Sequence, residues 1–269
     1  MKLNKMSHII IISLFIVFSY SHGKVLDLES YESIYEVSIN DKYKNKTLGQ
    51  TYIKQANGEL LLDWFNNCES WVSNQRLYIN FVNSAGVGTV SDIHYSLEEN
   101  DDNSTMKFYL QVKENNQLIK RINGQASKGE NVIVDISSPE KKSLSFPKNV
   151  LFPHEHLKLV VSKIDQSDES SILSSKVYEG SLPENFLEIT TFISEKKEKI
   201  DSKLISSQIK NSFRNIRMAY FENQSETPSL ELTAKINSQG IVGFFQYDYP
   251  TYSLVMNLKK INLKKIKCN

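Results

Sequence analysis

Residues 154–156 place two histidines and a glutamate side by side, which makes His154-Glu155-His156 the most metal-like group in the chain. Ligands on one face of a helix need a spacing of three or four residues, as in H-E-x-x-H. Here the two histidines are two residues apart, so on a helix they point in roughly opposite directions. We therefore interpret the triplet as a first helical turn with a surface or capping role, and we expect neither a metal nor a cofactor.

The chain contains two cysteines, Cys68 and Cys268. Residues 1–23 have the pattern of a secretion signal, and an even number of cysteines in an exported chain suggests a disulfide. This disulfide would join the first third of the chain to its penultimate residue. Two free thiols are the alternative, and metal binding by two such distant cysteines is a weaker one.

Other chemical motifs are missing from the sequence. The acidic run from Glu98 to Asp102 has no D-x-D-x-D-G loop, so we expect a solvated turn and not a calcium site. His94 lies in a predicted strand, opposite Ile93 and Tyr95, and is expected at the surface. There is no G-x-S-x-G elbow, P-loop or dinucleotide fingerprint. The sequence thus predicts no catalytic residues and no enzyme.

The first 23 residues have the pattern of a secretory signal peptide. Lys2 and Lys5 precede a ten-residue apolar run, Ile9–Phe18, and small residues follow at Ser21 and Gly23. The run is short for a membrane span, although an uncleaved anchor stays an alternative. Cleavage would remove two of 32 basic residues and none of 31 acidic residues, leaving a net charge near −1. That balance argues against nucleic acid as a partner. We expect residues 24–269 to form a single domain.

The histidine triplet lies in the stretch Phe146–Ile164, which is the one convincingly helical segment of the mature chain. Pro153 suits the first helical position, and Glu155 in the first turn meets the positive end of the helix dipole. An apolar stripe follows at helical spacing, formed by Leu157, Val160, Val161 and Ile164. A helix of about three turns is not stable alone, so this stripe must pack on a sheet.

Both sides of this helix show the alternation of β-strands, as in Tyr31–Ile39 and Trp71–Val82. Asn57-Gly58 predicts a hairpin turn. The basic run from Lys259 to Lys267 predicts a charged sheet edge that deters pairing, with contact to an anionic lipid or a partner as the alternative. About fourteen strands with short links favour a curled sheet that approaches closure. We predict a mainly β fold, a single curled antiparallel sheet that approaches an open barrel, with one central α-helix that lies across or inside it.

A curled sheet of this size can enclose an apolar cavity that takes a lipid. The aromatic residues near the C-terminus are candidates for its wall or for a partner surface, with ordinary core packing as the alternative. These candidates are Phe244, Phe245, Tyr247, Tyr249 and Tyr252.

Several motifs occur in a characteristic order along the mature chain. They are the Tyr31–Ile39 strand, Cys68-Glu69 with the Trp71–Phe81 strand, the strand–acidic turn–strand unit of residues 90–108, the F-P-x-x-V-L-F-P-x-x-H helix entry of residues 146–156, V-Y-E-G-S at 177–181, and Cys268. In this order they resemble the cell-envelope integrity protein EipB family, periplasmic proteins of alphaproteobacteria. The resemblance implies a β-spiral of about fourteen strands, one disulfide, a role in keeping the envelope intact, and no catalytic residues.

We accordingly expect a monomeric, non-enzymatic periplasmic protein that maintains envelope integrity by binding another envelope protein. The alternative is a carrier or sensor that holds a lipid or lipopeptide in the curled sheet.

Overall fold

The structure is a computed structural model that describes residues 26, 28–40, 52–222 and 225–268. The predicted signal segment, residues 1–23, lies outside this described part of the chain.

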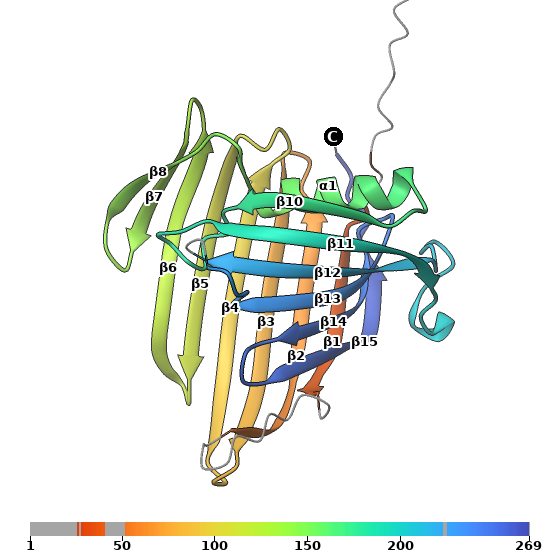
Figure 1. The fold of residues 1–269 in the computed structure, drawn as a ribbon, viewed down its shortest axis with the longest axis horizontal. Coiled ribbons are helices and arrows are strands. Elements are labelled where there is room, and N and C mark those ends of the chain that lie inside the picture. Colours follow the sequence, from red (N-terminus) through yellow and green to blue (C-terminus); the bar gives the residue numbers. More distant parts are fainter. Residues whose placement is uncertain (1–25, 27, 41–51, 223–224, 269) are drawn as a thin grey trace, which may run out of the picture.

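Fifteen strands form one continuous sheet within the described residues (Figure 1). The first eight strands are β1 (Tyr31–Ile39), β2 (Ile53–Asn66), β3 (Ser70–Asn83), β4 (Gly88–Asn100), β5 (Thr105–Glu114), β6 (Gln117–Lys128), β7 (Val132–Ser138) and β8 (Lys142–Phe146). The others are β9 (Val150–Leu151), β10 (Ser171–Val177), β11 (Leu187–Glu198), β12 (Phe213–Glu222), β13 (Leu230–Asn237), β14 (Val242–Asp248) and β15 (Ser253–Leu263). A helix, α1 (Pro153–Gln166), and a 3-10 turn, η2 (Ser202–Leu204), complete the described elements. The predicted mainly β, barrel-like fold with one α-helix is confirmed, with fifteen strands instead of about fourteen.

The strand order explains how the sheet curls. It runs from β8 back to β1, passes to β15, and then runs back to β9, so the two edge strands are neighbours in sequence. The first and last strands pair antiparallel in its middle, from Tyr31 opposite Leu263 to Ile39 opposite Leu254. All neighbouring strands are antiparallel except β9 and β10. The predicted charged edge near the C-terminus is only partly right: β15 lies in the middle of the sheet, but its pairing with β14 covers Ser253–Asn257, and Lys259 and Lys260 lie beyond that part.

The predicted hairpin turn at Asn57-Gly58 is also wrong. Both residues lie inside β2, where Gly58 is paired with Val37 on one side and Ile79 on the other. A Cβ atom on Gly58 would lie 2.2 Å from the carbonyl oxygen of Tyr78. The glycine thus marks a close approach of two backbones within the sheet, which is the other common reason for glycine in a strand.

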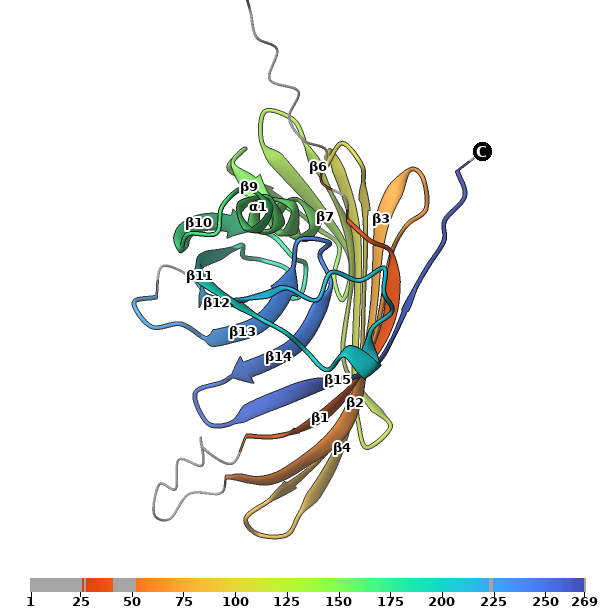
Figure 2. The ribbon, with the colours of Figure 1, turned by 90° about the vertical axis from the view of Figure 1, so that its right-hand side faces the viewer.

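Helix α1 begins at Pro153 as predicted and ends two residues beyond Ile164. Its apolar stripe packs on the inner faces of β10–β14, with Val160 and Val161 fully buried. Figure 2 shows the helix nearly end-on, inside the opening of the curl between β10 and the strands β6 and β7. The helix thus closes the gap between the two arms of the sheet, near the two free edges.

Candidate functional site

The first turn of α1 is buried against the inner wall of the sheet. His154 is 1% exposed, and its ring stacks on Trp71 of β3 with centroids 4.7 Å apart and lies 5.2 Å from the ring of Trp64 of β2. His156 is buried as well. The expected surface role of these histidines is wrong, because the helix starts inside the curl, where even its first turn faces side chains of the sheet.

Glu99 of β4 lies at the amino end of this helix. Its Oε1 atom accepts a hydrogen bond from the backbone N–H of His154 at 2.8 Å. Glu99 is 2% exposed, so the expectation of a solvated acidic turn fails for this residue. Burial raises its pKa to about 7, although backbone N–H groups of His154 and Glu155 act in the opposite direction. The strand simply continues through Glu99 to Asn100 and carries the carboxyl group into the interior.

Glu155 performs the capping role expected for the triplet. Its Oε2 atom accepts a hydrogen bond from the backbone N–H of Phe152 at 3.2 Å, and it pairs with Lys128 of β6. The helix start is therefore fixed to β3, β4 and β6 by one ring stack, one hydrogen bond and one ion pair.

Glu99 and His154, which we call the acid–imidazole cluster, are sealed from solvent. A general acid or base must reach its substrate within hydrogen-bonding distance, and neither Glu99 nor His154 has an exposed side chain. Within the described residues, no group of three or more His, Cys, Asp or Glu side chains is arranged to hold a metal ion. We assign the cluster a role in positioning the helix.

The structure joins Cys68 and Cys268 in a disulfide. Cys68 lies in the turn between β2 and β3, and Cys268 lies just beyond β15. The bond ties the segment that follows β15 to the rim where α1 begins, because Trp64 and Trp71 flank the same turn.

An apolar pocket of about 400 Å³ lies at the opposite end of the inner wall. The hairpin that joins β14 to β15 crosses in front of β2–β4 at this end (Figures 1 and 2) and forms one side of the pocket. Its lining side chains come mostly from the inner faces of β3, β4 and β5, and most of them are apolar. Among them are Leu77, Phe81, Ile93, Val112, Tyr249 and Tyr252.

The five predicted aromatic residues divide between three environments. Tyr249 and Tyr252 line the pocket and stack on each other, with ring centroids 4.8 Å apart. Phe245 and Tyr247 pack into the core of the curl. Phe244 projects from the other face of β14, where the ammonium of Lys235 lies 5.8 Å from its ring centroid.

Deeper on the inner wall, a polar cluster surrounds Glu179, which follows β10. The hydroxyl group of Tyr95 donates a hydrogen bond to the Glu179 carbonyl oxygen, and Ser181 donates one to the Glu179 carboxylate. Burial raises the pKa of Glu179. Burial, with a contribution from the Glu179 carboxylate, also raises the pKa of Tyr247 to about 12. These hydroxyl groups therefore stay neutral donors near pH 7.

Sequence reasoning missed this polar cluster. Glu179 belongs to the V-Y-E-G-S motif at the end of β10, so its position carried a signal. Tyr95 lies two residues after Ile93 on the inner face of β4, and Tyr247 lies two residues before Tyr249. Together these residues give the inner wall an apolar end and a hydroxyl-rich interior, an arrangement that could hold an amphipathic or largely apolar ligand.

No helix in the described part of the chain is both long and apolar enough to cross a membrane. The fold and its inner wall define a barrel-like β-protein made from one curled sheet around a short helix. The chain belongs to the EipB-like family, whose model matches residues 23–265. This confirms the resemblance inferred from the ordered motifs.

A relative in sequence and a solved structure, both from Brucella abortus, are similar to the chain. The chain is 20% identical over 251 residues to the cell envelope integrity protein EipB of strain 2308, an alignment that covers 90% of this chain and 87% of EipB. The fold matches the crystal structure of a beta-barrel-like protein of Domain of Unknown Function DUF1849 with a TM-score of 0.81 and 18% identity. That match covers 89% of this chain and all of the other.

Proposed function

We propose that the protein helps to maintain the integrity of the cell envelope as a non-catalytic, monomeric binding protein of the periplasm. Membership in the EipB-like family and the name of the Brucella relative support the envelope role. The burial of the acid–imidazole cluster supports a non-catalytic role. The observation that carries a binding role is the open apolar pocket beside Tyr249 and Tyr252.

The ligand that we favour is an apolar segment of another envelope protein. Tyrosine is enriched among the residues that dominate binding energy, and such residues bind an anchor side chain in a desolvated pocket. Tyr249 is 37% exposed, so its ring is available at the rim, while Tyr252 reaches the inner wall and contacts Phe81 edge-on with centroids 5.9 Å apart.

A lipid or lipopeptide is the second candidate. The pocket is lined by the apolar inner faces of β3–β5, and the hydroxyl groups near Glu179 lie deeper along the same wall. The wall thus has an apolar end followed by hydroxyl groups, and this arrangement suits a molecule with one acyl chain and one polar group.

Photo-crosslinking from inside the cell tests both candidates. A benzoylphenylalanine is placed at position 249, and a matched control carries it at Tyr78, which is 51% exposed on the outer face of β3. We expect an adduct from position 249 that is absent from position 78. Mass spectrometry then distinguishes a protein adduct, which supports the favoured ligand, from a lipid adduct, which supports the second. No adduct at position 249 would contradict binding at this pocket.

A deletion strain tests the envelope role separately. We expect greater sensitivity to detergents and cell-wall antibiotics, restored by the wild-type gene and by Tyr78→Asp but not by Tyr249→Asp. Unchanged resistance in the deletion strain would overturn the proposed role.

A further inference from the structure

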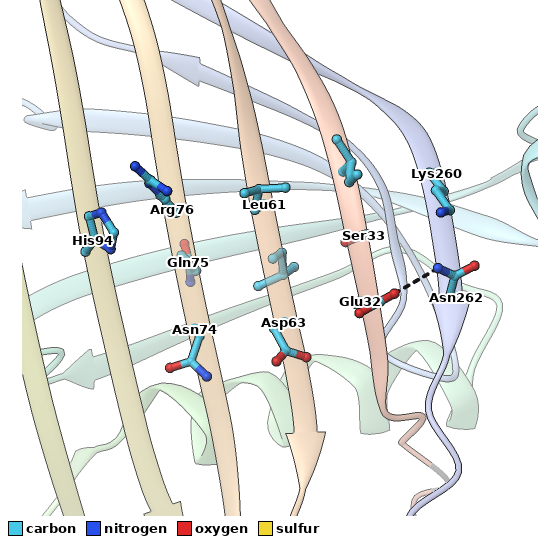
Figure 3. A pocket seen from close by; sticks show the side chains of 12 residues that line it. Glu32, Ser33, Leu61, Asp63, Asn74, Gln75, Arg76, His94, Lys260 and Asn262 are labelled. Atoms are coloured by element: carbon cyan, nitrogen blue, oxygen red, sulfur yellow. Dashed lines mark hydrogen bonds between the residues drawn. The ribbon is translucent and has the colours of Figure 1, made fainter.

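The outer face of the sheet carries a groove of about 330 Å³ that none of the proposed roles uses. It crosses β15, β1, β2 and β3 and reaches His94 of β4 (Figure 3). Its exposed side chains, such as Glu32, Leu61 and Asn74, alternate along their strands with buried core residues such as Leu62, so the groove and the inner pocket lie on opposite faces of the same sheet.

One side of the groove is a row of hydrogen-bonding side chains, one from each strand. Glu32 lies opposite Asn262 on one side and Asp63 on the other, and Asp63 lies opposite Asn74. Neighbouring strands are about 4.8 Å apart, so the row offers a carboxylate or carboxamide at that interval. The Asn262 amide donates to the Glu32 carboxylate at 2.8 Å, which holds both groups in place (Figure 3).

The next row along the strands has an apolar centre. Ile34 and Leu61 lie opposite each other on β1 and β2, and Leu61 is 42% exposed. Lys260 of β15 lies opposite Ile34, and Arg76 of β3 lies opposite Leu61, so one cationic side chain stands at each end of the apolar pair. The groove thus presents a narrow apolar strip beside a parallel row of amides and carboxylates.

The charges of the groove cancel. Glu32 and Asp63 are balanced by Lys260 and Arg76. Asp63 also pairs with Lys264, and Arg76 makes a two-point contact with Asp92 at 3.0 and 3.1 Å. Such a surface has no net attraction for a phosphate or another ion.

The surrounding sheet excludes a peptide strand that would bind by strand addition. β1, β2 and β3 are each paired on both sides, so the backbone groups under most of the groove are already used. The pairing of β15 with β14 ends at Asn257, so only the rim of the groove at Lys260 and Asn262 lies beyond that pairing. The apolar strip is also too small to hold an acyl chain. What remains is a neutral ligand with many hydroxyl or amide groups and small apolar faces.

We propose that this groove binds an uncharged oligosaccharide that lies across the strands. The spacing of the polar row is close to the length of one pyranose unit, so successive sugars would meet successive side chains. Their hydroxyl groups would bond to the row from Asn262 to Asn74, and their C–H faces would pack on Ile34 and Leu61. This inference concerns the outer face and is independent of the inner pocket.

Titration calorimetry with the full mature chain tests the proposal, using N-acetylchitotetraose and maltotetraose as probes. The test variants are Asn74→Ala and Leu61→Ala. Their matched controls are Asn80→Ala, an exposed asparagine farther along β3, and Leu118→Ala, a leucine of similar exposure on β6. Thermal unfolding verifies that each variant is folded, which we expect because all four side chains are exposed.

We expect saturable binding of at least one tetrasaccharide, and each test variant should weaken it about fivefold or more, the loss typical of one hydrogen bond or its equivalent. The controls should stay within about twofold. Absence of saturable binding by both sugars would overturn the proposal. Binding that is the same in the wild type, Asn74→Ala and Leu61→Ala would also overturn it, because the sugar would then lie elsewhere.

Discussion

Mild acid should destabilise this protein through the two histidines at the start of α1. Burial lowers the pKa of His154 from its ordinary value of 6.5 to about 3, with a smaller contribution from Lys158. Burial alone lowers the pKa of His156 to about 4. The nearby Glu99 has the opposite behaviour, because burial raises its pKa from 4.5 to about 7.

The sign of the effect follows from which state binds protons. Below pH 6.5 the unfolded chain takes up a proton at both histidines, whereas the folded chain keeps them neutral until about pH 4. Protonation of the two histidines therefore favours the unfolded chain, and their contribution to the free energy of unfolding decreases as the pH falls. Glu99 acts in reverse, since the folded state binds its proton near pH 7 and the unfolded state near 4.5. Between pH 6.5 and 4.5 these three groups together bind about one more proton in the unfolded chain, so their contribution lowers the free energy of unfolding by about 1.4 kcal/mol per pH unit, or ~3 kcal/mol in all. Glu179, whose pKa burial also raises, acts in the same direction as Glu99.

Two substitutions should change this slope in opposite directions. His154→Phe keeps an aromatic ring on Trp71 but removes one titrating group, so the slope between pH 6.5 and 4.5 should fall by about 1.4 kcal/mol per pH unit. Glu99→Gln removes an opposing group, so the slope should rise by about 1.4 kcal/mol per pH unit. Both ring nitrogens of His154 are buried without a hydrogen-bond partner in the described structure. His154→Phe should therefore also stabilise the fold at pH 7.5, by about 1–3 kcal/mol.

Urea unfolding followed by tryptophan fluorescence measures all of these quantities. The sequence has two tryptophans, Trp64 and Trp71, and both contact His154, so the signal comes from the cluster itself. Measurements at pH 7.5, 6.5, 5.5 and 4.5 give the slope for the wild type and each variant. The reasoning is refuted if His154→Phe retains the wild-type slope, or if Glu99→Gln flattens it.

Three further predictions concern stability. Replacing both Cys68 and Cys268 by serine should lower the free energy of unfolding by up to about 5 kcal/mol, because their disulfide closes a loop with a sequence separation of 200 residues. Urea unfolding midpoints with and without reductant measure this, and equal midpoints for the variant and the oxidised wild type would contradict it. Gly58→Ala should destabilise the sheet by about 1–3 kcal/mol through its clash with a neighbouring backbone carbonyl, whereas the control Gly88→Ala, whose nearest atoms are 3.9 Å away, should change the melting temperature little. Arg214→Lys should cost about 2–4 kcal/mol, because the buried guanidinium donates to three backbone carbonyls that one ammonium cannot reach in the same geometry; a melting temperature within error of the wild type would count against that role.

Local pattern was sufficient to predict the helix and most of the strands of this fold. Alternating apolar residues identified strands such as Tyr31–Ile39, and Pro153 with the stripe from Leu157 to Ile164 identified the helix and its first residue. These signals are local because they arise from the period of each element and from the caps at its ends. The order of motifs along the chain also sufficed to indicate the family.

Tertiary pairing decided everything that depends on which segments meet. Asn57-Gly58 has the composition of a turn, but Gly58 is required because another strand approaches its backbone closely. The C-terminal lysines resemble those of an edge strand, yet β15 lies between β1 and β14 in the middle of the sheet. Whether a polar residue is buried was equally hidden: Glu99 and His154 look like surface residues in sequence, and they are interior because the curl brings β4 and the helix together. The sequence by itself thus determined the helix, most of the strands and the family, whereas long-range strand pairing determined the inner pocket, the outer groove and the buried acid–imidazole cluster.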